Sequence, residues 1–232
     1  MLIIGFEPRF APRCGPFSNQ GVARRSLLLR FFAALAFLVI AASVRADPAV
    51  TVARGVAFVI NEDPSNPLGQ RQAGSVLWRI NRIKAIGQPE ELVIHAEIGI
   101  PKMNMTVTID FKRNTDKSLP ASHLVELKYV LPRDVAGGSV ISVPGIMMKF
   151  AESVRGTPLS AQSAKITEGS FLIALSNQEV DRIRNLQLLK ERAWFDIPMI
   201  YADQHRGILS IEKSFRGEDV FHEAMTAWER PR

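Results

Sequence analysis

Cysteine is almost absent from this 232-residue chain, in which Cys14 is the only one. Cys14 precedes a hydrophobic run, so residues 47–232 contain no thiol. This absence excludes a disulfide, a zinc site built on cysteine and a cysteine nucleophile from that part of the chain. The 186 residues from 47 to 232 are enough to bury a core that needs no covalent cross-link.

A charge excess is also missing once the first 46 residues are set aside. The whole chain carries 29 Lys and Arg against 23 Asp and Glu, a formal net charge of +6. Six of those basic residues and one acidic residue lie in residues 1–46, which leaves 23 basic and 22 acidic residues in residues 47–232. Nucleic-acid-binding domains usually carry a basic patch or stripe, so we expect no nucleic-acid partner.

The common catalytic motifs are missing as well. The sequence has no G-x-S-x-G elbow, phosphate-binding loop or dinucleotide fingerprint. His222 and Glu223 are not followed by the second histidine of a zincin helix, and the four histidines have no spacing that predicts a metal site. Ser210 and Lys213 match S-x-x-K, but on an expected strand they point to opposite faces. We therefore expect no cofactor and no metal.

One long apolar run is present, at residues 31–44. Arg24, Arg25 and Arg30 precede it, and Val44-Arg45-Ala46 follows as a small-x-small sequence. Basic residues, a core of about 7–15 apolar residues and a small-residue site are typical of a signal peptide. We expect cleavage after Ala46 and a periplasmic or secreted product. The alternative is an uncleaved signal anchor, although a spanning helix needs about 20 apolar residues.

The segment before the run sets the expected domain boundaries. Residues 1–22 are neither basic nor patterned enough for a domain, and we expect the true start of translation near Val22. Arg24-Arg25 also resembles the pair of a twin-arginine export signal, which leaves the export route open. The predicted organisation is an extension plus signal peptide over residues 1–46 and a single domain over residues 47–232.

Short runs of alternating apolar and polar residues dominate the rest of the chain and predict β-strands. In residues 91–100, for example, every second side chain is apolar. Strands are expected at 55–60, 75–83, 91–100, 103–111, 123–131, 139–141, 145–150, 163–167, 170–175, 194–202 and 206–213. Residues 61–72 and 113–122 are expected to be loops, and Pro198 places its strand at an edge or a bulge.

Two amphipathic helices are expected, near residues 177–191 and 217–228. Ser176 and Glu179 form a capping-box pattern ahead of the first. Its predicted apolar stripe consists of Val180, Ile183, Leu186 and Leu189, and that of the second helix of Phe221, Met225 and Trp228. With so many short strands and few helices, the predicted fold is mainly β, an antiparallel β-sandwich or flattened barrel.

Two groups of polar residues are candidate binding sites. The densest group contains three arginines whose planar guanidinium groups suit a carboxylate or phosphate. The alternative is a helix face crossed by ion pairs. The second group lies in an expected loop, where an Asx-turn is the alternative. The candidate residues are Arg182, Arg184, Arg192 and Asp196 in the first group and Asn114 and Asp116 in the second.

Two carboxylate–histidine pairs are candidates for general acid–base catalysis, Glu97 with His95 and Asp203 with His205. The first pair shares the more polar face of an expected strand, where the alternative is a solvated surface pair. The second lies between two expected strands, where the alternative is a turn. These pairs support a hydrolase as a second hypothesis.

Four segments carry a resemblance to a known family: RNTDKSLPASH (113–123), VPGIMMK (143–149), RNLQLLKERAWFDIP (184–198) and ILSIEK (208–213). They resemble an uncharacterised family of exported alphaproteobacterial proteins, over roughly residues 59–228. The last strand and helix are also faintly similar to invasion-associated locus B proteins, which are secreted, mainly β and usually contain cysteines. The resemblance implies export but assigns no catalytic residue.

Together these patterns favour a non-catalytic binding or interaction module of the cell envelope. Its expected partner is an envelope protein or a small anionic ligand. A periplasmic hydrolase that uses a carboxylate–histidine pair is the first alternative. An envelope component tethered by an uncleaved segment at residues 31–44 is the second, and in that case alone would the chain contact a membrane.

Overall fold

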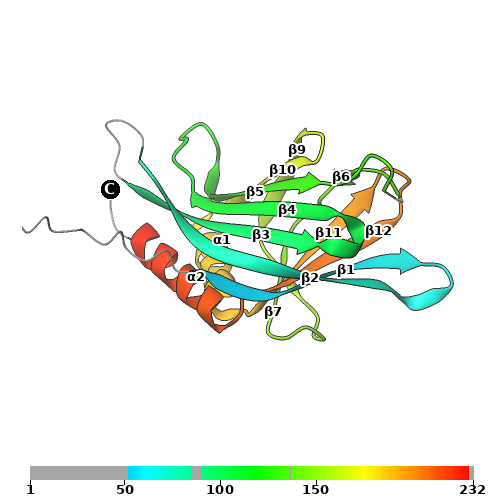
Figure 1. Ribbon diagram of the computed structural model, residues 1–232. Helices are drawn as coiled ribbons and strands as arrows, with labels where there is room; N and C mark the ends of the chain where they lie inside the picture. Colours follow the sequence, from blue (N-terminus) through cyan, green and yellow to red (C-terminus); the bar gives the residue numbers. More distant parts are fainter. Residues whose placement is uncertain (1–51, 85–89, 136, 230–232) are drawn as a thin grey trace, which may run out of the picture. The chain divides into compact units, whose positions relative to one another are not determined.

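Alternating side chains fold the described residues (52–84, 90–135 and 137–229) into one curled antiparallel sheet in a computed structural model (Figure 1). The predicted signal peptide, its cleavage site after Ala46 and the extension at residues 1–22 lie outside these residues. The prediction of a mainly β fold with two helices is confirmed. Neither helix in the described part of the chain has the length and apolar character that crossing a bilayer requires.

The sheet has the strand order β8-β7-β11-β12-β1-β2-β3-β4-β5-β10-β9, with β6 paired to β11, and it curls into a half-barrel (Figure 1). All of these neighbouring strands pair antiparallel. The strands are β1 (Ala53–Asp63), β2 (Asn66–Ile83), β3 (Glu91–Ile100), β4 (Met105–Arg113), β5 (Ala121–Val130), β6 (Val140–Ser142), β7 (Met147–Lys149), β8 (Thr157–Pro158), β9 (Ala161–Thr167), β10 (Ser170–Ser176), β11 (Trp194–Tyr201) and β12 (Arg206–Glu212). The helical elements are a 3-10 turn, η1 (Pro101–Met103), and the helices α1 (Glu179–Glu191) and α2 (Phe215–Trp228).

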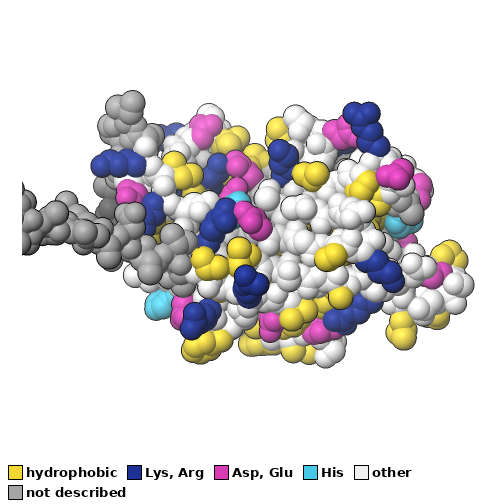
Figure 2. All heavy atoms as spheres, viewed as in Figure 1, with side chains coloured by type: hydrophobic (Ala, Val, Ile, Leu, Met, Phe, Trp, Pro, Cys, Tyr) yellow, Lys and Arg dark blue, Asp and Glu magenta, His cyan; other side chains and the backbone are white. Residues whose placement is uncertain are grey.

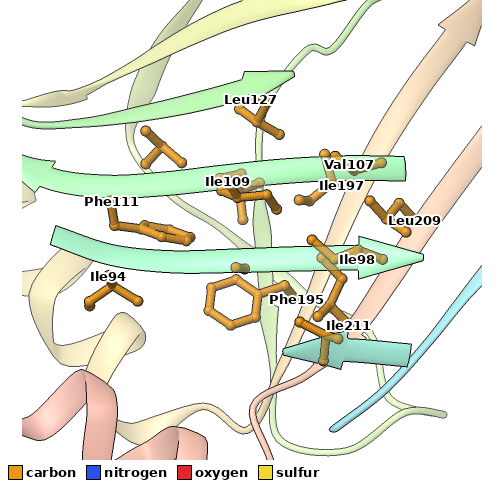
Figure 3. Close-up of a cluster of buried hydrophobic side chains, with 14 of the residues drawn as sticks. Ile94, Ile98, Val107, Ile109, Phe111, Leu127, Phe195, Ile197, Leu209 and Ile211 are labelled. Carbon is orange, nitrogen blue, oxygen red and sulfur yellow. The ribbon is translucent and has the colours of Figure 1, made fainter. Parts of the chain in front are cut away.

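The core lies on the concave face of the sheet. Side chains of β3, β4 and β5, among them Ile94, Ile109 and Leu127, face Phe195 and Leu209 of β11 and β12 across the interior (Figure 3). Burying one such side chain contributes about 1.5–3 kcal/mol. Packing between the two halves of the sheet therefore holds the half-barrel in its curled form.

The helices cover one end of the half-barrel. Helix α2 contacts β1, β2, β3 and α1, and its Phe221 lies 5.2 Å from the ring of Trp78 and 5.6 Å from that of Phe111, measured between ring centroids. The indole nitrogen of Trp78 donates to the carbonyl oxygen of Glu212 at 2.9 Å. Such aromatic contacts add to the apolar area that α2 buries. This end of the core is thus closed.

The predicted details of α1 are partly wrong. Its N-cap is Gln178, which makes no side-chain capping bond, because Ser176 still pairs with β5 as the last residue of β10. The capping box is therefore absent. Of the predicted stripe, Leu189 is buried and Leu186 packs partly buried against the core, but Val180 and Ile183 are exposed. Asn185 and Leu188 are buried in their place. The side-chain amide of Asn185 accepts from the backbone nitrogen of Ser160 and donates to its carbonyl oxygen, both at 2.8 Å, which rotates the helix away from the predicted stripe.

The loop predicted over residues 61–72 is also wrong, because β1 and β2 continue through it as a long hairpin. Asp63 accepts hydrogen bonds from the backbone nitrogen and the hydroxyl of Ser65 at 2.8 and 2.6 Å, which forms a tight Asx-turn. Pro198 was expected to place its strand at an edge or a bulge, but β11 is not an edge strand, because it lies between β7 and β12. On its side away from β12, β11 pairs with β7 at one end and with β6 at the other. Pro198 lies between these two pairings, where β11 has no partner strand on that side.

The convex face of the sheet carries mixed charges. In Figure 2, basic and acidic side chains are interspersed over this view of the molecule, without a patch of one sign. Arg79 pairs with Glu97 at 2.7 Å, and Lys112 pairs with Glu126 at 2.5 Å. Exposed pairs of this kind contribute little to stability. They give the sheet a solvated outer surface.

Candidate ligand-binding site

A cavity of about 530 Å³ lies at the end of the half-barrel away from α2. Three connections border it: η1 between β3 and β4, residues 132–135 after β5, and residues 203–205 between β11 and β12 (Figure 1). We call it the mouth cavity. Because antiparallel strands joined by short turns bring their ends together, residues far apart in the sequence meet here.

The strand register brings polar side chains to the inner face behind this cavity. Asn61 of β1 lies opposite Gly207 of β12, and Gln72 of β2 lies opposite Val59. A Cβ atom on Gly207 would lie 2.6 Å from Asn61 Oδ1 and 3.0 Å from Tyr201 Cε2. Glycine at this position therefore lets the Asn61 amide and the Tyr201 ring approach each other.

Four buried polar atoms at this end make no hydrogen bond of good geometry among the described residues: Asn61 Oδ1, Gln72 Oε1, Tyr129 Oη and Tyr201 Oη. The Asn61 side chain is nevertheless close enough to the Tyr201 hydroxyl to lower the pKa of Tyr201. Asn61 and Gln72 line the mouth cavity, and both tyrosines are buried. A buried polar group without a partner costs about 1–3 kcal/mol. Native structures leave few such groups, and those of Asn61 and Gln72 belong to residues that line a cavity, so these two are the candidates for binding polar groups of another molecule.

Both tyrosines keep their hydroxyl proton at neutral pH. Burial raises the pKa of Tyr201 to about 12, while the adjacent Asn61 side chain lowers it in part and the charge of Asp203 raises it. Burial, and then the neighbouring Tyr201, raise the pKa of Tyr129 still further. Each neutral hydroxyl has one proton to donate and lone pairs to accept.

Asp203 and His205 form a close pair at the rim of the mouth cavity. Asp203 Oδ1 lies 2.5 Å from His205 Nδ1 and accepts from the His205 backbone nitrogen at 3.1 Å. The hydrogen bond from His205 lowers the pKa of Asp203, so this carboxylate is ionised at neutral pH. The His205 ring stacks on Tyr201 with a centroid distance of 4.2 Å. The pair thus borders the cavity, and the His205 ring contacts the ring of the buried Tyr201.

Gly137 holds the His205 ring from the other side. It has a φ of +88°, a left-handed conformation that favours glycine. A Cβ atom there would lie 2.0 Å from His205 Cε1. The position of the ring therefore depends on the absence of a side chain at residue 137.

The structure does not gather the three predicted arginines around Asp196. Arg182 and Arg184 are exposed on α1, and ten residues of helix, about 15 Å, separate Arg182 from Arg192. The Arg192 guanidinium lies 3.2 Å from the ring centroid of Phe150. Asp196 accepts from the Ser210 hydroxyl at 2.7 Å and pairs with Lys149 at 2.9 Å. Arg182 and Arg184 thus belong to a different part of the surface from Asp196.

Asn114 and Asp116 organise their own loop. The Asn114 amide donates to the carbonyl oxygens of Asp116, Leu119 and Ala121 at 2.8–3.1 Å. Asp116 accepts from the backbone nitrogen and hydroxyl of Ser118 at 2.8 and 2.7 Å. This is the Asx-turn arrangement. The loop borders a second cavity, of about 860 Å³, but hydrogen bonds within the loop already occupy the Asn114 amide group and Asp116 Oδ1.

The other predicted pair, His95 with Glu97, lies in an ion network on the convex face. His95 Nδ1 is 2.6 Å from Asp110 Oδ1, and His95 Nε2 is 3.3 Å from Glu97 Oε1. Both ring nitrogens are therefore occupied. Within residues 52–84, 90–135 and 137–229, no group of three or more histidine, cysteine or acidic side chains is placed to hold a metal ion.

Ser210 and Lys213 point to opposite faces of their strand, as expected. Ser210 donates to Asp196 on the convex side, and Lys213 Nζ donates to the carbonyl oxygen of Leu189 inside the core. The two side chains therefore share no site.

Sequence reasoning pointed to Asp203 and His205 but missed Asn61, Gln72 and the two tyrosines as site residues. Asn61 and Gln72 fell in a segment expected to be a loop, and Tyr129 was expected on an apolar strand face. One signal was present. Asn61 continues the inward alternation of Ala57 and Val59 with a polar side chain.

Comparison of the chain with protein-family models, with curated proteins and with solved structures finds no match. The family resemblance given above therefore stays a prediction. Function is inferred from the mouth cavity itself.

Proposed function

We propose that this chain is an exported, non-catalytic binding module of the cell envelope whose half-barrel holds a small polar molecule in the mouth cavity. The proposal rests on one observation: two buried amide oxygens without hydrogen-bond partners among the described residues, Asn61 Oδ1 and Gln72 Oε1, belong to residues that line the mouth cavity. Binding sites for small molecules are concave, pre-formed and furnished with a few converging polar groups, and β-barrel mouths are among their usual places.

The cavity walls support binding rather than covalent catalysis. Its described lining contains no serine, threonine or cysteine that could act as a nucleophile beside His205. Asn61 and Gln72 come from long paired strands, and such rigid elements hold a binding group in place better than loops do. A ligand that completes the hydrogen bonds of these groups would recover the desolvation cost that they carry.

Export is the second part of the proposal, and the sequence supports it. The basic residues, the apolar run at 31–44 and the site after Ala46 have the order of a signal peptide. A domain without cysteine needs no oxidative folding step after export. The alternative is a protein tethered to the membrane by an uncleaved segment at residues 31–44. It would have the full-length mass and would be found in the membrane fraction.

Native mass spectrometry tests both parts together. The full chain would be expressed with its own leader in a bacterium and recovered from the periplasmic fraction. We expect a polypeptide that begins at Asp47 and an added mass of one small molecule. The added mass should disappear in Asn61→Leu, which removes the amide at similar size, and persist in Asn177→Leu, an exposed control.

Each part of the proposal has a result that would overturn it. A full-length mass found only in the membrane fraction would contradict release by cleavage. A polypeptide without added mass, together with no response of the Tyr201 and His205 ring resonances to any of a panel of small polar compounds, would contradict binding at the mouth.

A hydrolase is the second candidate function, and the 2.5 Å contact between Asp203 and His205 favours it. Such a pair could activate a water molecule as a general base. The test is turnover of generic ester, phosphate and glycoside substrates by wild type and Asp203→Asn. We expect no turnover. A measurable rate of turnover that falls at least 100-fold in Asp203→Asn would show that the protein is a hydrolase and not a non-catalytic binding module.

A further inference from the structure

We infer that the mouth cavity selects a small cationic amine, a ligand class opposite in charge to the anion expected from the sequence. The inference rests on the proposed function, because it names the ligand of the same site. Two properties of the cavity support it: the charges on its rim and the kind of polar atom in its lining residues Asn61 and Gln72.

The rim of the mouth cavity is mainly acidic. The ionisable side chains that line it are Glu62, Asp134, Asp203, Lys102 and His205. Three carboxylates therefore face a single lysine and a histidine that is already paired with Asp203. With Asp203 paired to His205, Glu62 and Asp134 face Lys102 alone. The rim therefore has one carboxylate in excess, which repels an anion and attracts a cation.

The orphaned atoms behind the rim point to the same ligand. Asn61 Oδ1 and Gln72 Oε1 are carbonyl oxygens, which only accept hydrogen bonds. An ammonium group has three donors and no acceptor. It therefore matches the two carbonyl oxygens, while a carboxylate would place acceptor against acceptor.

The backbone around the cavity supports the same assignment. Asn61 and Gln72 come from the paired strands β1 and β2, so their amide groups are held in place beside the acidic rim. The site thus offers acceptors of fixed position to a compact donor.

Three four-carbon probes test the class of ligand: 1,4-diaminobutane, 1,4-butanediol and butanedioate. They share one carbon skeleton and differ only in whether the end groups are ammonium, hydroxyl or carboxylate. Isothermal titration with the cleaved wild-type protein at pH 7 should give one site for the diamine and an affinity at least tenfold higher than for either other probe. Its affinity should fall as salt is raised, because charge attraction is screened.

Matched variants place the binding at the mouth. Asp134→Asn removes one exposed rim charge and should weaken the diamine about 3- to 10-fold. Asn61→Leu should weaken it at least tenfold. Asp219→Asn, an exposed control on α2 far from the cavity, should leave the affinity unchanged.

Three outcomes would overturn the inference: no binding of the diamine, equal weakening by Asp134→Asn and Asp219→Asn, or tighter binding of the diol or the dicarboxylate. If one of the last two probes binds and Asn61→Leu abolishes it, the mouth is the site and only the ligand class is wrong. If no probe binds and the native mass shows no added molecule, the proposed function fails as well.

Discussion

The two ends of the half-barrel differ in which of their buried polar groups have hydrogen-bond partners. At the end covered by α2, the indole nitrogens of Trp78 and Trp228 each donate to a backbone carbonyl at 2.9 Å, and Lys213 donates to Leu189. There are exceptions there: both ring nitrogens of His123 and the hydroxyl of Ser214, the N-cap residue of α2, have no partner among the described residues. At the mouth, two amide oxygens and two tyrosine hydroxyls make no hydrogen bond of good geometry among the described residues.

This difference separates stability from binding. Satisfied polar groups and packed aromatic rings lower the free energy of the folded state, while orphaned groups raise it. Sites that bind ligands commonly carry such a local cost. The helix-covered end is therefore expected to hold the fold together, and the mouth to hold a ligand.

Truncation of the aromatic cluster should have the largest effect. Trp78 is fully buried, and Phe221 and Phe195 lie 5.2 and 5.6 Å from it between ring centroids. Trp78→Ala should lower the free energy of unfolding by about 3–5 kcal/mol, measured by urea denaturation. Met103→Ala, at the half-buried mouth, should cost under about 1 kcal/mol. Equal losses of unfolding free energy in the two variants would contradict the proposed difference between the two ends.

Lys213 should make stability rise with pH above neutrality. Its Nζ lies 4.4 Å from the ring centroid of Phe221. Burial lowers its pKa to about 7, against a partial rise caused by Glu218. Between pH 7 and the ordinary lysine pKa, the unfolded chain binds a proton that the folded chain does not. The free energy of unfolding should therefore increase by up to about 4 kcal/mol from pH 7 to 10.

The variant Lys213→Met isolates this contribution. It keeps an unbranched chain in the same packing but has no charge, so the rise between pH 7 and 10 should largely vanish. Wild type and variant should be compared by urea denaturation at each pH. An unchanged slope in the variant would mean that other groups cause the rise.

His123 should make the protein sensitive to acid. Its ring lies 5.0 Å from that of Trp228. Burial, and then the charges of Arg113 and Arg182, lower its pKa to about 4. Because this folded-state pKa is depressed, the contribution is fully present above about pH 6.5 and is lost as the pH falls to 4, about 3 kcal/mol in total. In His123→Phe this acid loss should shrink, as followed by thermal unfolding between pH 4 and 7.

Gly137→Ala tests whether the backbone at residue 137 holds the His205 ring in place at the mouth. The added methyl group would meet the His205 ring at a left-handed backbone position. We expect a stability loss of about 1–2 kcal/mol together with loss of the stacking of His205 on Tyr201, visible as changed ring chemical shifts. Gly145→Ala meets no atom within 4 Å and is the control. Unchanged His205 shifts in Gly137→Ala would refute the contact.

The strands and helices were largely predictable because their residues are neighbours in the sequence. Strict alternation in β3 and the spacing of Phe221, Met225 and Trp228 in α2 each reflect one face of one element. The rotation of α1 was not predictable, because it depends on Asn185 meeting the backbone of Ser160, a contact between distant segments.

The mouth was less predictable for the same reason. Asp203 and His205 are two residues apart, so their pairing could be proposed from the sequence. Asn61, Gln72, Tyr129 and Tyr201 lie on four strands, and only the pairing order of the sheet brings them to one end. The predicted binding site around the three arginines and Asp196 did not form, because these residues are near in sequence but lie on different elements, α1 and β11, and point to different parts of the surface.

The free energy of unfolding of ligand-free Tyr201→Phe, measured by urea denaturation at pH 7 beside wild type, tests the contrast between the two ends most directly. The substitution removes only a buried hydroxyl without a partner, so the variant should be as stable as wild type or up to about 1 kcal/mol more stable. A loss of 2 kcal/mol or more, about the cost of leaving a partner unsatisfied, would show that the hydroxyl serves the fold rather than a ligand.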